Sequence, residues 1–223
     1  EKAGIMRPNV PVITGATGVA RETLLAAAAK LGSPIRVVEG ESHLPIGLSG
    51  PYQRRNAAMV ERAVAALRER GWEIPFEALA RGLASARWAG RMETWIDPAG
   101  AIWLADGAHN PGGIRALCEA LKQEHAGRRW TMIFGALADR DARGMLEHLI
   151  PFANSLVLVA PPSPRAMAPE ELASGLRHPE PRLASSVLEA VAMARDFSGP
   201  YAVFGSLYLV GAVKQVLGWF PEP

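Results

Sequence analysis

The feature that most constrains the fold is a unit of apolar strand, short loop and helix that recurs four times in the second half of the chain. The clearest copy begins at Ala101, where an apolar run ends at Asp106 and a glycine-rich loop leads into a helical pattern from Pro111. Proline suits the first turn of a helix, because the amide hydrogen that it lacks would have no partner there. Strands and helices that alternate in this way form a mainly parallel sheet covered on both faces. We therefore predict an α/β fold.

The expected elements follow from apolar periodicity and from Gly and Pro at the breaks. Before residue 87, strands are predicted at 10–15 and 35–39 and helices at 20–31, 54–70 and 75–86, with Ala57, Val60, Val64 and Leu67 on one face of the second helix. After it, a hairpin is predicted at 92–96 and 101–105, strands at 130–134, 155–160 and 201–204, a short piece near 182–183, and helices at 111–125, 141–149, 169–176, 186–197 and up to about 217.

Composition and charge exclude several classes of protein. The chain has 223 residues, is 49% hydrophobic and 21% charged, and has a formal net charge of +2, which are values of a globular protein. It has no basic run with interleaved aromatic residues, so we expect no nucleic-acid partner. The most hydrophobic stretch, 201–220, is interrupted by Gly205-Ser206 and by Lys214-Gln215, so we expect a buried strand and helix and no membrane span. The single cysteine, Cys118, has helical spacing with leucines and indicates a core thiol in a reducing compartment.

Polar residues that follow the predicted strands form the candidate site. Ligands bind at the carboxyl ends of the strands in open α/β sheets, and the free amides of a helix N-terminus can hold an anion there. The polar residues of these loops are Asp106, His109, Asn110, Asp139, Asp141, Ser163, Arg165 and Ser206. They suit a polar small molecule, and the sequence has no GxxxxGK[ST] loop, GxGxxG fingerprint, Cys/His metal set or GxSxG elbow.

Several polar residues have a structural interpretation beside the functional one. Ser206 has no neighbouring base that would make it a nucleophile, so we expect it to cap a helix. Solvated or capping roles are expected for the remaining histidines, which are His43, His125, His148 and His178. On these residues alone, the 106–111 motif is either a polar turn at a helix start or part of a ligand site.

A series of short motifs in a fixed order gives the chain a family resemblance. The most specific are Asp-Gly-Ala-His-Asn-Pro at 106–111 and Gly-Ser-Leu-Tyr-Leu-Val-Gly at 205–211. The others lie at 1–5, 11–15, 53–57, 88–92, 134–141 and 161–165. With these motifs the whole chain resembles folylpolyglutamate synthase and its bifunctional relative, dihydrofolate synthase/folylpolyglutamate synthase, in the Mur ligase superfamily. The resemblance implies a Rossmann-like, mainly parallel C-terminal domain at 91–223, preceded at 1–90 by the C-terminal part of a Mur-ligase-type ATPase domain.

The activity that the resemblance implies is an ATP-dependent amide-bond ligase. Such an enzyme passes the γ-phosphoryl group of ATP to a carboxylate of folate or dihydropteroate, and the amino group of L-glutamate then attacks the acyl phosphate. This chemistry needs donors for the phosphates, Mg²⁺ to neutralise charge, and a closed site that keeps water away. The resemblance also leads us to expect a cytoplasmic monomer with small-molecule substrates.

Five residues match functional positions of the family. Lys2 matches a lysine carried as a carbamate, an anionic ligand that helps to hold Mg²⁺. Asn56 matches a residue at the adenine side of the ATP site, although alone it would pass for a helix N-terminal cap. Arg91 matches an arginine that reaches the ATP phosphates, which a guanidinium can grip with two hydrogen bonds. Asp106 matches an aspartate at the ribose and phosphate end of ATP and is also expected to be catalytic. His109 matches a catalytic histidine near the reacting groups, where it can act as a base or a positioning group.

The sequence also departs from the family pattern. The family's phosphate loop, and its Ser, Glu and His ligands for a first Mg²⁺, lie upstream of the 1–5 motif and are not in this sequence. We therefore expect a part of a longer enzyme that is inactive alone. Tyr52 stands where many relatives have histidine, Asn110 is expected to support its turn, and Ser163, Arg165 and Ser206 are assigned no certain role.

Two alternatives remain open at the level of sequence. One is a non-catalytic α/β module that binds a nucleotide or glutamate, and the other is a Mur-type ligase that acts on a cell-wall precursor. The motifs at 134–141 and 205–211 favour the folate enzyme over the cell-wall enzyme.

Overall fold

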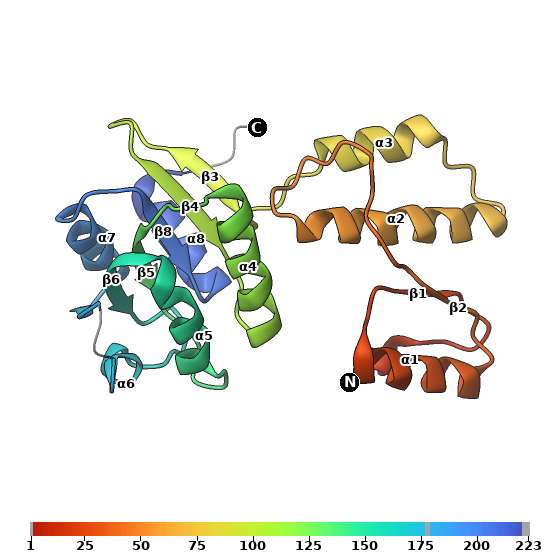
Figure 1. Cartoon of the computed structure of the whole chain (residues 1–223), viewed down its shortest axis with the longest axis horizontal. Coiled ribbons are helices and arrows are strands. Elements are labelled where there is room, and N and C mark those ends of the chain that lie inside the picture. The colour runs from red at the N-terminus through yellow and green to blue at the C-terminus, as the bar shows by residue number, and fades with distance from the viewer. Residues whose placement is uncertain (1, 177–178, 220–223) are drawn as a thin grey trace. The chain divides into compact units, whose positions relative to one another are not determined.

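The computed structural model describes residues 2–176 and 179–219 and divides into two compact units, 1–87 and 88–223 (Figure 1). The predicted boundary is residue 90, and the observed division falls between Arg87 and Trp88. No helix among the described residues has the length and apolar character needed to cross a membrane.

The first unit pairs a small sheet with helices. Its elements are the 3-10 helix η1 (Lys2–Ile5), β1 (Val12–Thr14), α1 (Gly18–Leu31), β2 (Ile35–Val37), α2 (Tyr52–Glu69) and α3 (Phe76–Ser85). β1 and β2 form a two-stranded parallel sheet. As the sequence predicts, α1 ends at Gly32, whose left-handed φ of 61° is open to glycine without strain. Residues 38–51 form the loop that joins β2 to α2.

Few apolar side chains of the first unit are buried. Among its described residues, the buried apolar ones are Met6, Ala28, Ala57, Ala66 and Leu83. Val60 and Leu67 remain 42% and 38% exposed, so only part of the predicted apolar face of α2 is covered. Trp72 and Phe76 are 63% and 56% exposed. The first unit therefore has a thin core for its length.

The second unit contains a six-stranded sheet. Its elements are β3 (Glu93–Ile96), β4 (Ile102–Asp106), α4 (Pro111–Glu124), β5 (Trp130–Phe134), α5 (Ala142–Leu149), η2 (Ile150–Phe152), β6 (Ala153–Val159), α6 (Pro169–Ala173), β7 (Arg182–Ala184), α7 (Val187–Arg195), β8 (Tyr201–Phe204) and α8 (Leu207–Leu217). The strand order is β3-β4-β8-β5-β6-β7, and every pair except β3–β4 is parallel. The predicted mainly parallel α/β fold is confirmed.

Most predicted bounds in the second unit agree with the structure to within two residues, and the two elements that differ most are α6 and β7. α6 ends at Ala173 and not at residue 176, because Gly175 takes a left-handed φ of 78° that breaks the helix. The short piece near 182–183 is a true edge strand, β7, which pairs with β6.

Both faces of the six-stranded sheet are buried. Trp103, Ile133 and Val203 share a cluster with residues of α7 and α8. The neighbouring positions Leu104 and Met132 are also 0% exposed, and alternation along a strand turns them to the opposite face. Figure 1 shows α4 and α5 together on the side of the sheet away from α7. The core therefore has two layers, which fix the strands between them.

The strand ends line up as the sequence predicts. In the sheet register, Phe204 at the end of β8 stands between Asp106 of β4 and Phe134 of β5. Phe134 in turn pairs with Leu158 of β6. The loops after these parallel strands therefore start side by side along one edge of the sheet, where the candidate polar residues lie.

Candidate functional site

The loop that carries Arg91 is tied tightly to the end of β4. Gly90 and Met92, on either side of Arg91, have left-handed φ values of 69° and 45°. The amide of Met92 donates to Asp106 Oδ2 at 2.9 Å, and the amide of Gly107 donates to the Gly90 carbonyl at 2.8 Å. Arg91 itself is half-buried, and its guanidinium has no hydrogen bond or ion pair with the part of the chain that the structure describes. Hydrogen bonds thus fix the backbone on both sides of Arg91, while its guanidinium can still bind a ligand.

Asp106 links the Arg91 loop to the His109 loop. Asp106 is buried, with only 2% of its surface exposed. Oδ1 accepts the amide of Ala108 at 2.8 Å, and Oδ2 accepts the amide of Met92. A buried carboxylate needs such donors, since burial without them is strongly unfavourable. The structure therefore gives Asp106 a structural role between the two loops, and its contact with the ribose and phosphates of ATP stays a prediction.

His109 follows on the same loop with one ring nitrogen engaged. It is half-buried, and its Nδ1 lies 2.8 Å from the carbonyl oxygen of Gly107. Because a carbonyl can only accept, this hydrogen bond places the proton on Nδ1, and Nε2 of the neutral ring is then an acceptor. Asn110 caps α4 by accepting the amide of Gly113 at 2.8 Å, as expected of a residue that supports the turn.

The other polar residues of the sheet edge mainly stabilise their own loops. Ser206 is the N-cap of α8 and accepts the amide of Tyr208 at 3.2 Å, which confirms its predicted capping role. Arg165 donates to Asp139 at 3.1 Å, so the loop after β6 is joined to the loop after β5. Ser163 accepts the Arg165 amide at 3.3 Å, and Asp141 caps α5.

The remaining histidines and the cysteine have local roles. His125 ends α4 with its ring edge-on to Trp130, and burial lowers the pKa of its imidazole. His148 bonds the Gly144 carbonyl within α5, His43 lies in a loop, and His178 lies outside the described residues. Cys118 is buried, as predicted, and burial raises the pKa of its thiol to about 11.

Asn56 lies beside a cavity of the first unit. It is in the second turn of α2, which begins at Tyr52, so the interpretation of Asn56 as a helix N-terminal cap is wrong. Its Nδ2 donates to Oε1 of the buried Gln53 at 2.9 Å, which orients the amide. The cavity has a volume of about 660 Å³, within the usual range of small-molecule sites. The cavity is lined by Gly15, Ala16, Thr17, Val38, Glu39, Gly40, Glu41, Tyr52, Arg55, Asn56 and Met59.

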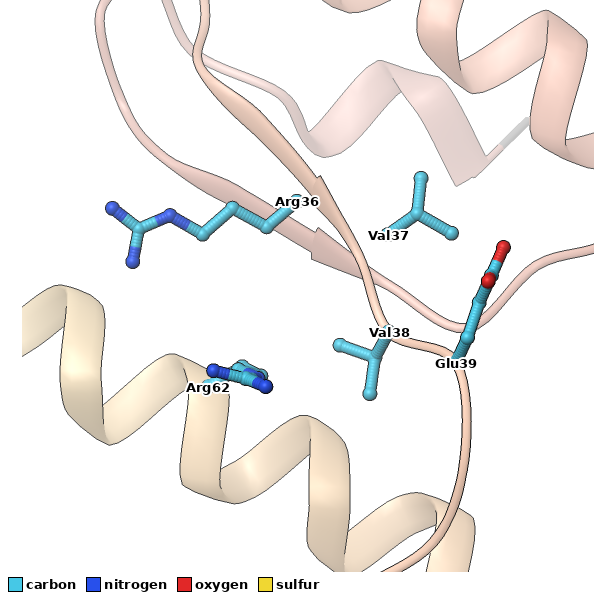
Figure 2. A pocket seen from close by; sticks show the side chains of 5 residues that line it. All are labelled: Arg36, Val37, Val38, Glu39 and Arg62. Carbon is cyan, nitrogen blue, oxygen red and sulfur yellow. The ribbon is translucent and has the colours of Figure 1, made fainter.

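A second cavity of the first unit contains none of the predicted site residues. Figure 2 shows its lining, with Arg62 from α2 and Arg36, Val37, Val38 and Glu39 from β2 and the residues after it. Its volume is about 480 Å³. Two of the charged groups here have partners, since Arg36 donates to Glu69 and Arg21 donates to Glu39. The hydrogen bond from Arg36 lowers the pKa of the exposed Glu69 carboxyl.

The described side chains do not form a Mg²⁺ site by themselves. Within 2–176 and 179–219, no group of three or more His, Cys, Asp and Glu residues could hold a metal ion. Lys2 starts η1, but its side chain lies outside the described part of the structure, so its role as a carbamate ligand stays a prediction. Of the five predicted site residues, the structure links the loops of Arg91, Asp106 and His109, while Lys2 and Asn56 belong to the other unit.

Sequence reasoning missed two residues that contact the Arg91 loop. Glu93 accepts the amide of Gly90 at 2.7 Å and forms an ion pair with Lys214 of α8. The Lys214 side chain is only 9% exposed. The available signal was a lysine in a mostly apolar helix, one turn after Val210 and therefore on its buried face.

The chain is similar in sequence to several known proteins. The family model for the glutamate ligase domain of Mur ligases matches residues 90–204. The folylpolyglutamate synthase of Lacticaseibacillus casei is 33% identical to the chain, over 97% of this chain and 56% of the relative. The dihydrofolate synthase/folylpolyglutamate synthase of Bacillus subtilis is 28% identical, over 97% and 57% respectively.

A solved structure has a similar fold. The Mycobacterium tuberculosis folylpolyglutamate synthase complexed with ADP matches with a TM-score of 0.82 at 25% identity, over 99% of this chain and 58% of that one. The chain spans about half the length of the curated relatives that it matches. The family match covers the Arg91 loop, β4 and the His109 loop together. The chain belongs to the Mur ligase family and contains its glutamate ligase domain.

Proposed function

We propose that this chain is part of an ATP-dependent ligase that adds L-glutamate to folates, with dihydropteroate as a second possible acceptor. The observation that carries the proposal is the Arg91 loop, whose guanidinium has no partner among the described residues and whose backbone is hydrogen-bonded to Asp106 and Gly107, just before the half-buried His109. The similarity to folylpolyglutamate synthases, which extends over nearly the whole chain, supports folate as the substrate class. We also propose that the protein is a cytoplasmic monomer.

The reaction consists of two transfers. A folate carboxylate oxygen bonds to the γ-phosphorus of ATP as ADP leaves, and the glutamate nitrogen then bonds to the acyl carbon as phosphate leaves. The attacking amine loses a proton, for which His109 Nε2 is an acceptor when the ring is neutral. Arg91 can stabilise negative charge on the phosphoryl oxygens with two parallel hydrogen bonds.

We assign the nucleotide base to the cavity beside Asn56. An asparagine amide can pair with N6 and N7 of adenine at once, and Asn56 keeps an oxygen and a second N–H beyond its bond to Gln53. We assign residues 1–87 to the C-terminal part of an ATPase domain, in agreement with the thin core of this unit.

The test uses the complete protein that contains this chain, with ATP, Mg²⁺, L-glutamate and tetrahydrofolate or dihydropteroate. ADP release and the mass of the product should show one glutamate added for each ATP consumed. We expect Arg91→Ala and His109→Ala each to lower the rate by on the order of a hundredfold, because each removes a group that acts in the transition state.

A matched control is Arg182→Ala, which removes an arginine whose ion pair with Asp196 lies on the surface. Its rate should equal that of the wild type. Near-normal rates for both Arg91→Ala and His109→Ala would contradict the site assignment. Nucleotide binding without any turnover would favour the non-catalytic module. The 223 residues alone should not ligate glutamate.

A further inference from the structure

A largely buried ion pair contacts the Arg91 loop at Gly90. Lys214 of α8 and Glu93 of β3 are far apart in sequence, yet their side chains form an ion pair. The Lys214 side chain is 9% exposed and that of Glu93 is 21% exposed. The Lys214 Nζ also lies 4.6 Å from the centre of the Trp219 ring, a cation–π contact. Charges that are this well buried lose hydration, so such a pair is retained only where its geometry is good.

The two carboxylate oxygens of Glu93 have different partners. Oε1 accepts a hydrogen bond from the ammonium group of Lys214, whereas Oε2 accepts one from the backbone amide of Gly90 at 2.7 Å. The carboxylate therefore connects α8 to the residue that precedes Arg91. Because Lys214 fixes one oxygen, the other can hold the Gly90 amide in a single position.

Gly90 is held by further contacts. Its carbonyl accepts the amide of Gly107, and the side chain of Leu207 packs over both glycines. A Cβ on Gly107 would overlap the Leu207 side chain, so any other residue there would require Leu207 to move. On the far side of Arg91, Met92 is bound to Asp106. The backbone on both sides of Arg91 is thus anchored, with Glu93 anchoring the first side.

We propose that the Glu93–Lys214 ion pair is a positioning device that fixes the Arg91 loop in its phosphate-binding conformation. This inference rests on the proposed function, since it assigns Arg91 to the nucleotide phosphates. Glu93 and Lys214 act through Arg91 and do not contact the substrate. Loss of the pair frees Gly90, and the guanidinium then samples positions that do not meet the phosphates.

The experiment measures the dissociation constant of ADP by calorimetry, and the KM for ATP, in the complete protein. Glu93→Gln keeps an oxygen that can accept the Gly90 amide but removes the charge that holds Lys214. We expect weaker ADP binding by on the order of tenfold, because small misplacements of a positioned group have large effects. The KM for ATP should rise in parallel, while the KM for glutamate stays unchanged. Lys214→Arg should restore most of the affinity that Lys214→Met loses.

A double-variant cycle tests whether Glu93 acts through Arg91. If it does, Glu93→Gln combined with Arg91→Ala binds ADP as weakly as Arg91→Ala alone. Equal additional weakening in the Arg91→Ala background would overturn the inference. So would unchanged ADP affinity in Glu93→Gln, provided that Arg91→Ala is weakened, and the proposed function would then still stand.

A control variant tests whether the effect is specific to Glu93, and the wild-type protein tests the proposed function itself. Glu119→Gln removes an exposed ion pair with Lys122 and should leave ADP affinity within twofold, roughly the effect of a surface pair. Glu93→Gln is the main variant, since Lys214→Met leaves a buried carboxylate unpaired and can prevent folding. If wild-type protein neither binds ADP nor turns over, the proposed function itself fails.

Discussion

The two units of the chain differ in how they are stabilised. The largest fully buried side chains, from Trp103 and Trp130 to Met145, all belong to the second unit among the residues described. Side chains there cap the helices α4, α5, α7 and α8, whereas the caps of α1, α2 and α3 in the first unit make no side-chain hydrogen bond. The contrast indicates that the second unit has a larger apolar core and better-capped helices than the first.

The core gives the largest test of this contrast. Leu104→Ala in β4 removes a fully buried side chain, and we expect it to lower the free energy of unfolding by about 2–5 kcal/mol. Leu67→Ala in α2 removes one that is 38% exposed, and its effect should stay below about 1 kcal/mol. Urea unfolding followed by circular dichroism compares the two variants. Equal losses would show that the first unit is as well packed as the second.

Cys118 provides a smaller, pH-dependent test within the second unit. Burial raises the pKa of its thiol from 9.0 to about 11, so the thiol ionises first in the unfolded chain as the pH rises. Stability is then lost between about pH 9 and 11, by about 1 kcal/mol at pH 10. The urea midpoint of unfolding should therefore fall further between pH 8 and pH 10 in the wild type than in Cys118→Ala. A loss that is the same in both proteins would contradict the burial of Cys118.

The helix caps give the smallest test. Asn110→Ala removes the acceptor for the Gly113 amide at the start of α4 and should cost about 0.5–1 kcal/mol, as exposed caps do. Thr17 occupies the same position before α1 but makes no capping hydrogen bond. Thr17→Ala should therefore change the free energy of unfolding by at most about 0.3 kcal/mol. The comparison fails if the two substitutions have the same effect on the unfolding midpoint.

Local sequence rules predicted the second unit well because its signals agree with one another. Pro111, Asn110 and the apolar run before Asp106 each indicate one strand, turn and helix, and the strand ends meet at one edge as expected. The first unit was harder, since the apolar spacing of Val60 and Leu67 cannot tell whether a partner covers that face. Periodicity shows which residues share a side of a helix but not what lies against it.

The candidate site was only partly predictable. The residues of the 106–111 motif were found from sequence, because a polar turn between a strand and a helix start is a local pattern. The Glu93–Lys214 pair joins residues on β3 and α8, and only the fold brings them together. Asn56 was placed correctly on the second predicted helix of the chain, but its position within the second turn depended on where α2 begins.

The most direct test of the proposed ligase follows oxygen atoms during the reaction. The complete protein is incubated with ATP, L-glutamate and folate whose side-chain carboxylate carries ¹⁸O. If the carboxylate is phosphorylated before glutamate attacks, each turnover transfers one ¹⁸O atom to inorganic phosphate, which mass spectrometry detects. Phosphate that contains no ¹⁸O while glutamylated folate accumulates would contradict the account.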